Sequence, residues 1–126
     1  MTSSDIAGRK VLNRYKIEEK LGGGGMSVVW KAYDLVLDRS VALKVLRPEM
    51  SDDEEFIGRF RREAQSVASL SHPNIVNIYD VGEDGGLYFI IMELVDGETL
   101  RDKLRAEGRL PVDEALRIAQ QICEAL

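Results

Sequence analysis

The chain has 126 residues, of which 44% are hydrophobic and 31% are charged, a composition typical of one soluble globular domain. Its net charge of −5 argues against general nucleic-acid binding, which needs clustered basic side chains. A single cysteine, Cys123, excludes an internal disulfide framework. No signal-peptide pattern and no apolar run long enough to cross a bilayer is apparent, which predicts a cytoplasmic chain and leaves open an anchor in a longer parent protein.

The first part of the chain predicts three strands. Residues 1–13 are polar, and we expect them to be flexible. Residues 15–21 alternate along a strand, with one side formed by Tyr15, Ile17, Glu19 and Leu21. Residues 27–33 are β-branched and aromatic, which predicts a second strand and hence a hairpin around the intervening glycines. A third strand, residues 40–46, places Val41, Leu43 and Val45 on one face and Ala42 and Lys44 on the other.

The remaining elements predict an α+β fold. Ser51 and Glu54 have the spacing of a capping box, with a helix running on to about Leu70. Residues 75–81 and 87–94 predict two further strands, followed by helices from Thr99 to about Glu107 and from Pro111 onward. We therefore expect a five-stranded antiparallel sheet with one packed helix, then two more helices. The apolar stripe of the last helix has no predicted element to cover it, so we expect a truncated part of a larger fold.

The glycine run, Gly22 to Gly25, is the first candidate for a binding site. Glycine lets backbone N–H groups approach phosphate oxygens, although a flexible hairpin tip would look the same. A Walker A loop would end in Gly-Lys-Ser or Gly-Lys-Thr, which is absent. A dinucleotide-binding loop would lead into a helix, whereas this one leads into a predicted strand. The remaining phosphate-binding arrangement is a glycine-rich loop within a hairpin.

Lys44 and Glu63 form the second candidate. Lys44 lies in an apolar strand, where it is either a rim lysine reaching water or a functional cation. Glu63 falls on the same helical face as Phe56, Phe60 and Val67, where an unpaired carboxylate would be costly. Either Glu63 reaches solvent at the rim of the interface, or it pairs with a cation on the sheet. Lys44 is the lysine best placed to be that partner, and a lysine held in this way can neutralise phosphate charge.

Taken together, these residues resemble the bacterial eukaryotic-type (Hanks-type) serine/threonine protein kinases, from about Arg14 to Leu126. Residues 21–29 are similar to the kinase glycine-rich loop, with Ser27 in place of its third glycine. Residues 41–44, Val-Ala-Leu-Lys, match the strand that carries the kinase lysine, and Glu63 matches the glutamate of the C-helix. Residues 72–76 and 91–97 resemble the turn after that helix and the hinge.

The resemblance implies an ATP site and a domain division. The implied nucleotide contacts are Leu21, Gly22, Gly23, Gly24, Gly25, Met26, Ser27, Val29, Ala42, Lys44, Met92, Glu93 and Val95. In this interpretation Leu21, Val29 and Ala42 enclose the adenine, although they would also suit an ordinary sheet core, and Met92 is the gatekeeper. Residues 14–95 would form the ATP-binding N-terminal lobe, and residues 96–126 the hinge and the start of a helical lobe.

The expected activity is transfer of the γ-phosphate of Mg-ATP to Ser or Thr hydroxyls of protein substrates. The 126 residues contain neither a His-Arg-Asp nor an Asp-Phe-Gly sequence. We therefore expect the catalytic base and the Mg²⁺ ligands beyond Leu126, no metal ligand within the chain, and no activity from the chain alone. The alternative is a pseudokinase-like or truncated module that binds nucleotide or a partner without catalysis. The resemblance also implies a possible N-lobe homodimer through Arg14, Leu37 and Asp80, although an ordinary solvated face would also contain these residues.

Overall fold

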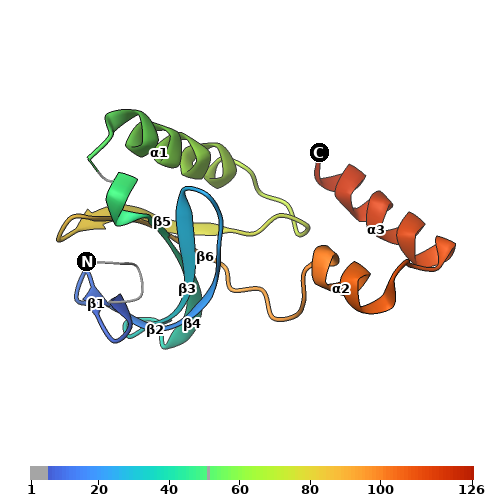
Figure 1. Cartoon of the computed structure of the whole chain (residues 1–126), viewed down its shortest axis with the longest axis horizontal. Helices are drawn as coiled ribbons and strands as arrows, with labels where there is room; N and C mark the ends of the chain where they lie inside the picture. The colour runs from blue at the N-terminus through green and yellow to red at the C-terminus, as the bar shows by residue number, and fades with distance from the viewer. Residues whose placement is uncertain (1–5, 51) are drawn as a thin grey trace.

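The computed structural model describes residues 6–50 and 52–126, which fold into a curled sheet, one helix lying across it, and a separate pair of helices (Figure 1). The strands are β1 (Lys10–Val11), β2 (Tyr15–Gly23), β3 (Ser27–Asp34), β4 (Arg39–Leu46), β5 (Ile78–Asp84) and β6 (Leu87–Met92). The α-helices are α1 (Glu54–Ala68), α2 (Leu100–Glu107) and α3 (Val112–Ala125), and a 3-10 turn, η2, spans Pro48–Met50.

The sheet is antiparallel throughout, with strand order β1-β2-β3-β4-β6-β5. The predicted α+β architecture is confirmed, and the short strand β1 is added to the five expected strands. Alternation in β4 works as predicted, because Val41, Leu43 and Val45 all enter the main core. The opposite face of the sheet supplies Leu46 and Ile90, which form a second apolar cluster with α1. The sheet therefore has the main core on one face and α1 on the other.

The expectation that residues 1–13 are flexible is wrong for residues 6–13. Ile6 is fully buried and Val11 is 1% exposed, and both belong to the main core. The backbone there is tied to β2, since the N–H groups of Gly8 and Ile17 bond across to Ile17 and Arg9 carbonyls at 2.7 and 2.9 Å. The few apolar residues of this segment show no strand or helix periodicity, which is why the sequence pattern did not reveal this packing.

Strand β2 also departs from the predicted alternation. Register shifts between Ile17 and Glu19, and between Lys20 and Gly22, interrupt its pairing with β3. Ile17 faces the core opposite Ala32, but Glu19 pairs with Lys31, and both of these charged residues line a surface cavity with Leu21. A β-bulge changes which face the following side chains occupy. The bulge thus directs Leu21 away from the core and toward the candidate site.

Several element boundaries differ from the predicted ones. The predicted N-cap Ser51 lies outside the described residues, and α1 is instead capped by Asp53, whose side chain accepts a hydrogen bond from the Glu55 N–H at 2.9 Å. The predicted capping box is therefore wrong, because Glu54 is the first helical residue. Strand β5 begins at Ile78 instead of Ile75, and β6 ends at Met92 instead of Leu94.

The turn between β3 and β4 is organised by Asp34, which is fully buried. Its carboxylate accepts two 2.8 Å hydrogen bonds from the Arg14 guanidinium and one each from the Val36 and Leu37 N–H groups. The Arg14 hydrogen bonds lower the pKa of Asp34 to about 2, and the two backbone donors act in the same direction against the opposing effect of burial. A single aspartate at the end of β3 thus joins the residue before β2 to the turn.

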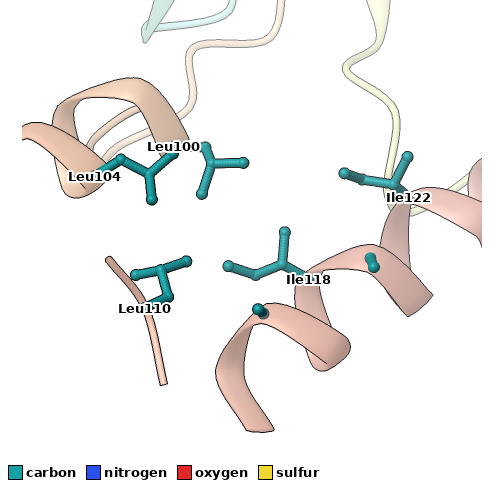
Figure 2. A pocket seen from close by; sticks show the side chains of 7 residues that line it. Leu100, Leu104, Leu110, Ile118 and Ile122 are labelled. Carbon is teal, nitrogen blue, oxygen red and sulfur yellow. The ribbon is translucent and has the colours of Figure 1, made fainter. Parts of the chain in front are cut away.

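Helices α2 and α3 lie to one side of the sheet and are joined to it by the extended segment after β6 (Figure 1). Thr99 is the N-cap of α2, and Gly108 ends it with a φ of 79°. The apolar side chains of both helices point into the space between them (Figure 2), a cavity of about 320 Å³ lined by Leu100, Leu104, Leu110, Ala115, Ile118, Ala119 and Ile122. In the part of the chain that is described, no helix has the length and apolar character needed to cross a membrane.

Candidate functional site

An ion pair between β4 and α1 is the centre of the candidate site. The Nζ of Lys44 lies 2.5 Å from the Oε1 of Glu63. Lys44 is on the face of β4 that also carries Leu46, and this face is covered by α1. Burial of Phe60 and Ala64 against the sheet sets the rotation of α1, and Glu63, one residue before Ala64, consequently points toward Lys44. The pairing predicted from the sequence is therefore present.

The expected burial of Glu63 is wrong, because 46% of its side chain is exposed, against 20% for Lys44. Phe60 and Ala64 occupy the buried part of the seam, and Glu63 lies at its open edge. A partly hydrated carboxylate avoids most of the cost of burying a charge. Glu63 thus both pairs with Lys44, as predicted, and reaches solvent at the rim, as the alternative interpretation held.

The ion pair opens onto a cavity of about 270 Å³ between the sheet and α1. Apart from Lys44 and Glu63, its lining is apolar: Val29, Ala64, Val67, Val76, Ile78, Ile90 and Met92. One ammonium group on an apolar wall suits a ligand that combines a flat apolar part with a negatively charged part. Val29 lies directly opposite Lys44 across the β3–β4 ladder, so the end of the glycine hairpin adjoins this cavity.

The glycine loop is open toward its surroundings. The φ angles of Gly22 to Gly25 are not positive, and a Cβ added to Gly22, Gly24 or Gly25 would meet no atom within 4 Å. Neither backbone conformation nor packing within the described chain therefore requires glycine at those three positions. The lack of side chains would instead allow a ligand to approach the backbone N–H groups closely, as phosphate does at such loops.

The remaining loop residues are more enclosed than predicted. Met26 packs against the cluster between α1 and the sheet, and Ser27 is 8% exposed. The Ser27 carbonyl accepts a 2.9 Å hydrogen bond from the Gly24 N–H, which closes the turn. These two residues shape the base of the loop.

A second cavity, of about 370 Å³, is lined by two of the remaining predicted residues. Leu21 and Val95 line it together with Glu19, Lys31, Leu94, Asp96, Gly97, Thr99 and Asp102. Ala42 is buried on β4 and pairs with Met92, at the edge of the first cavity. The N–H of Glu93 donates to the Asn77 carbonyl at 2.8 Å, which fixes the backbone where the chain leaves β6. The predicted nucleotide contacts are thus not gathered in one cavity. Val29, Lys44 and Met92 line the first cavity, Leu21 and Val95 line the second, and Glu93 lines a third with Val95.

Sequence reasoning missed Arg47 and the polar lining of the second cavity. Arg47 follows β4 and donates from Nε and Nη2 to the Gly24 carbonyl at 3.1 and 2.9 Å. The sequence did show that Arg47 lies three residues after Lys44 and therefore near the candidate site, but Arg47 belongs to no motif. Thr99 and Asp102 carry a helix-capping pattern, which concealed their position beside Val95.

The described residues fit the nucleotide better than they fit the metal. An ammonium group and an apolar wall line the first cavity, and the open glycine run adjoins it where Gly22 pairs with Val29. Within residues 6–50 and 52–126, no three His, Cys, Asp or Glu side chains come together in a way that could hold a metal ion.

Comparison with known proteins decides the family. Residues 15–126 match the model of the protein kinase domain. The chain belongs to the protein kinase family. Among its curated relatives, it is 51% identical over 121 residues to serine/threonine-protein kinase PrkC of Bacillus subtilis, covering 96% of this chain and 19% of the relative. It is 48% identical over 118 residues to serine/threonine-protein kinase PknB of Mycobacterium leprae, covering 90% of this chain and 19% of the relative.

A solved kinase domain agrees with this assignment. The PknI kinase domain of Mycobacterium tuberculosis superposes with a TM-score of 0.77 at 35% identity, covering 94% of this chain and 48% of the solved chain. The fold is therefore that of a bacterial Hanks-type kinase over the N-terminal lobe region. The chain spans about a fifth of the length of the curated relatives it matches.

Proposed function

We propose that this chain is the ATP-binding part of a protein serine/threonine kinase, which transfers the γ-phosphate of Mg-ATP to Ser or Thr hydroxyls of proteins. The observation that carries the proposal is the 2.5 Å ion pair between Lys44 and Glu63 beside an open glycine loop and an apolar cavity. A protein built only for stability would gain little from such a half-exposed pair. A phosphate-binding protein needs a cation whose position is set before the ligand arrives.

The proposed roles follow the resemblance to the kinase family, and the ion pair between Lys44 and Glu63 supports them. Lys44 binds the α- and β-phosphates, and Glu63 holds the Lys44 ammonium in place. The backbone N–H groups of residues 22–25 approach the phosphates from the hairpin side. The adenine lies between Leu21, Val29 and Ala42, with its edge on the Glu93 carbonyl and the Val95 N–H, and Met92 closes the back.

Magnesium, when bound with ATP, would neutralise phosphate charge. Since the described residues form no metal cluster, we place its ligands outside this chain, together with the catalytic base. The division into residues 14–95, which bind ATP, and residues 96–126, which continue into the helical lobe, belongs to the same proposal. Within this chain, the protein contributes binding and orientation of the nucleotide.

Titration with ATP tests the proposal. Removing the cation in Lys44→Met should weaken ATP binding by about 10- to 100-fold, because a charge-assisted hydrogen bond is lost. Glu63→Gln should weaken it by about threefold to tenfold, because Lys44 remains but is held less well. Lys16→Met is the matched control, since Lys16 is an exposed lysine on β2 that lines neither cavity. Equal ATP affinity in wild type and Lys44→Met would contradict the assignment of Lys44.

A second experiment separates the kinase from a module that binds without catalysis. The observation that favours such a module is that the sequence has one histidine, His72, and no His-Arg-Asp triplet. We expect the whole gene product to phosphorylate a Ser- or Thr-containing protein in a Lys44-dependent manner, and the 126-residue chain alone to transfer none. ATP binding without transfer in the whole gene product would favour the module.

The proposed function includes an N-lobe homodimer as a further element. Leu35, Val36 and Leu37 are 47%, 66% and 54% exposed at the β3–β4 turn, an apolar surface of the kind that favours contact between copies. Arg14 already donates to Asp34, so in such a dimer it would hold the β3–β4 turn in place. Sedimentation analysis should show mass rising with concentration, and a constant monomer mass would rule this element out.

A further inference from the structure

Arg47 connects the end of β4 to the glycine loop. Its guanidinium donates twice to one acceptor, the Gly24 carbonyl, from Nε at 3.1 Å and from Nη2 at 2.9 Å. The Arg47 backbone is fixed as well, because its N–H donates to the Met26 carbonyl and its carbonyl accepts from the Met50 N–H, each at 2.9 Å. Arg47 is half-buried. The side chain is therefore anchored at its base and directed at a single peptide group of the loop.

The loop also leaves room for this guanidinium. A Cβ on Gly23 would come within 3.3 Å of Nη2 of Arg47 and within 3.3 Å of the Ser27 carbonyl oxygen. Gly23 differs in this respect from its neighbours in the run, whose added Cβ atoms would meet nothing within 4 Å. Gly23 is thus the one position of the run where the chain's own packing favours glycine, and Arg47 is one of the two reasons.

The face on which Arg47 lies determines what it does to the loop. Lys44 and Leu46 share the face of β4 that α1 covers. Gly23 pairs with Val28, whose side chain lies in the main core on the opposite face. Because a Cβ on Gly23 would meet Nη2 of Arg47, the guanidinium lies on that opposite face as well. The Gly24 carbonyl is held toward that opposite face. The described chain has no cis peptide bond, and in a trans peptide the C=O and the following N–H point in opposite directions. The Gly25 N–H is therefore directed toward the side of the sheet where Lys44 lies.

We propose that Arg47 is a positioning residue that holds the Gly24–Gly25 peptide so that the Gly25 N–H faces the phosphate groups of the bound nucleotide. The inference rests on the proposed function, since it assumes that a nucleotide phosphate lies near Lys44. Glycine residues lose more conformational freedom on ordering than any other residue. Fixing one peptide of the run in advance lowers the ordering cost that phosphate binding would otherwise incur.

The test compares ligands with and without phosphates. Arg47→Ala should weaken binding of ATP and ADP by about fivefold, the effect of losing one oriented hydrogen bond. Its affinity for adenosine should stay within about twofold of wild type, because adenosine makes no contact with the phosphate-binding loop. Unchanged adenosine binding also shows that the variant is folded. Arg117→Gln, which removes an exposed arginine from α3, is the charge-matched control and should bind both ligands as wild type does.

Two further measurements distinguish orientation from charge. The ATP defect of Arg47→Ala should persist at about 0.5 M salt, whereas a purely electrostatic attraction from Arg47 would be screened there. In ¹⁵N-labelled protein, ATP should shift the Gly25 amide signal strongly in wild type and weakly in Arg47→Ala. Adenosine should leave that signal in place in both proteins.

The outcomes are separable. Equal weakening of ATP and adenosine would show that Arg47 serves general stability, and a defect that vanishes in salt would show that it acts only by charge. Either result overturns the proposal, as does unchanged ATP affinity in Arg47→Ala. Failure of the wild-type chain to bind ATP at all would instead overturn the proposed function, and this inference with it.

Discussion

The sheet region, formed by β1 to β6 and α1, differs sharply from the helical pair, formed by α2 and α3. The buried hydrophobic residues among those described all lie in the sheet region, from Ile6 to Ile91. Neither helix of the pair has a buried residue, although both are amphipathic. Their apolar side chains face one another across an open space (Figure 2). An amphipathic pattern thus predicts a helix, whereas burial depends on what packs against it.

The site draws its rigid parts from the sheet region and its second cavity from the boundary between the two regions. Lys44 and Glu63 are held by a strand and a helix whose neighbouring residues are buried. Thr99 and Asp102, at the start of α2, help to line the second cavity with Leu21 and Val95. The phosphate-binding half of the proposed site is therefore built before the ligand arrives, and the other half depends on how α2 is placed.

The largest expected difference between the regions is in the cost of removing apolar side chains. Phe60→Ala should lower the free energy of unfolding by about 3–5 kcal/mol, because Phe60 is 1% exposed in the seam between α1 and the sheet. Ile122→Ala, in α3, should cost less than about 1 kcal/mol, since Ile122 is 51% exposed. Urea denaturation measures both, with the fluorescence of the buried Trp30 reporting on the sheet region and far-UV circular dichroism reporting on the helices. Similar costs would mean that the helical pair is packed as firmly as the sheet region.

An intermediate effect is expected at Asp34. Asp34→Asn should lower the free energy of unfolding by about 2 kcal/mol, because charge-assisted hydrogen bonds from Arg14 are weakened. The folded-state pKa of Asp34, about 2, lies below its usual 3.8, so its ionisation stabilises the fold above about pH 4. This contribution is lost as the pH falls toward 2. Urea midpoints measured across that range should fall more steeply in wild type than in Asp34→Asn, and parallel curves would refute the assignment.

A smaller effect than that at Asp34 is expected at Thr99, whose hydroxyl accepts a 3.0 Å hydrogen bond from the Asp102 N–H. Thr99→Ala should destabilise α2 by about 1 kcal/mol. Because we expect the helical pair to open separately from the sheet, hydrogen exchange should accelerate in α2 while β3 and β4 keep their protection. If Thr99→Ala instead lowered the global free energy of unfolding by the same amount as it destabilises α2, the two regions would unfold as one unit.

Local sequence patterns were enough to predict the fold class, the strands of the hairpin and the pairing of Lys44 with Glu63. Alternation and helical spacing depend on local geometry, so Val41, Leu43 and Val45 were correctly placed on one face of their strand, which the structure buries in the main core. The same helical spacing placed Glu63 next to buried residues and made a cationic partner the expected solution.

The remaining features depend on contacts that local patterns do not predict. The entry of Ile6 and Val11 into the core, the bulge that turns Leu21 outward and the half-exposure of Glu63 each depend on contacts between distant segments. The hold of Arg47 on Gly24 likewise joins residues 23 positions apart. Local patterns record which face a side chain prefers. Which atoms then lie across from it depends on the register and curvature of the whole sheet, and no short stretch of sequence contains that information.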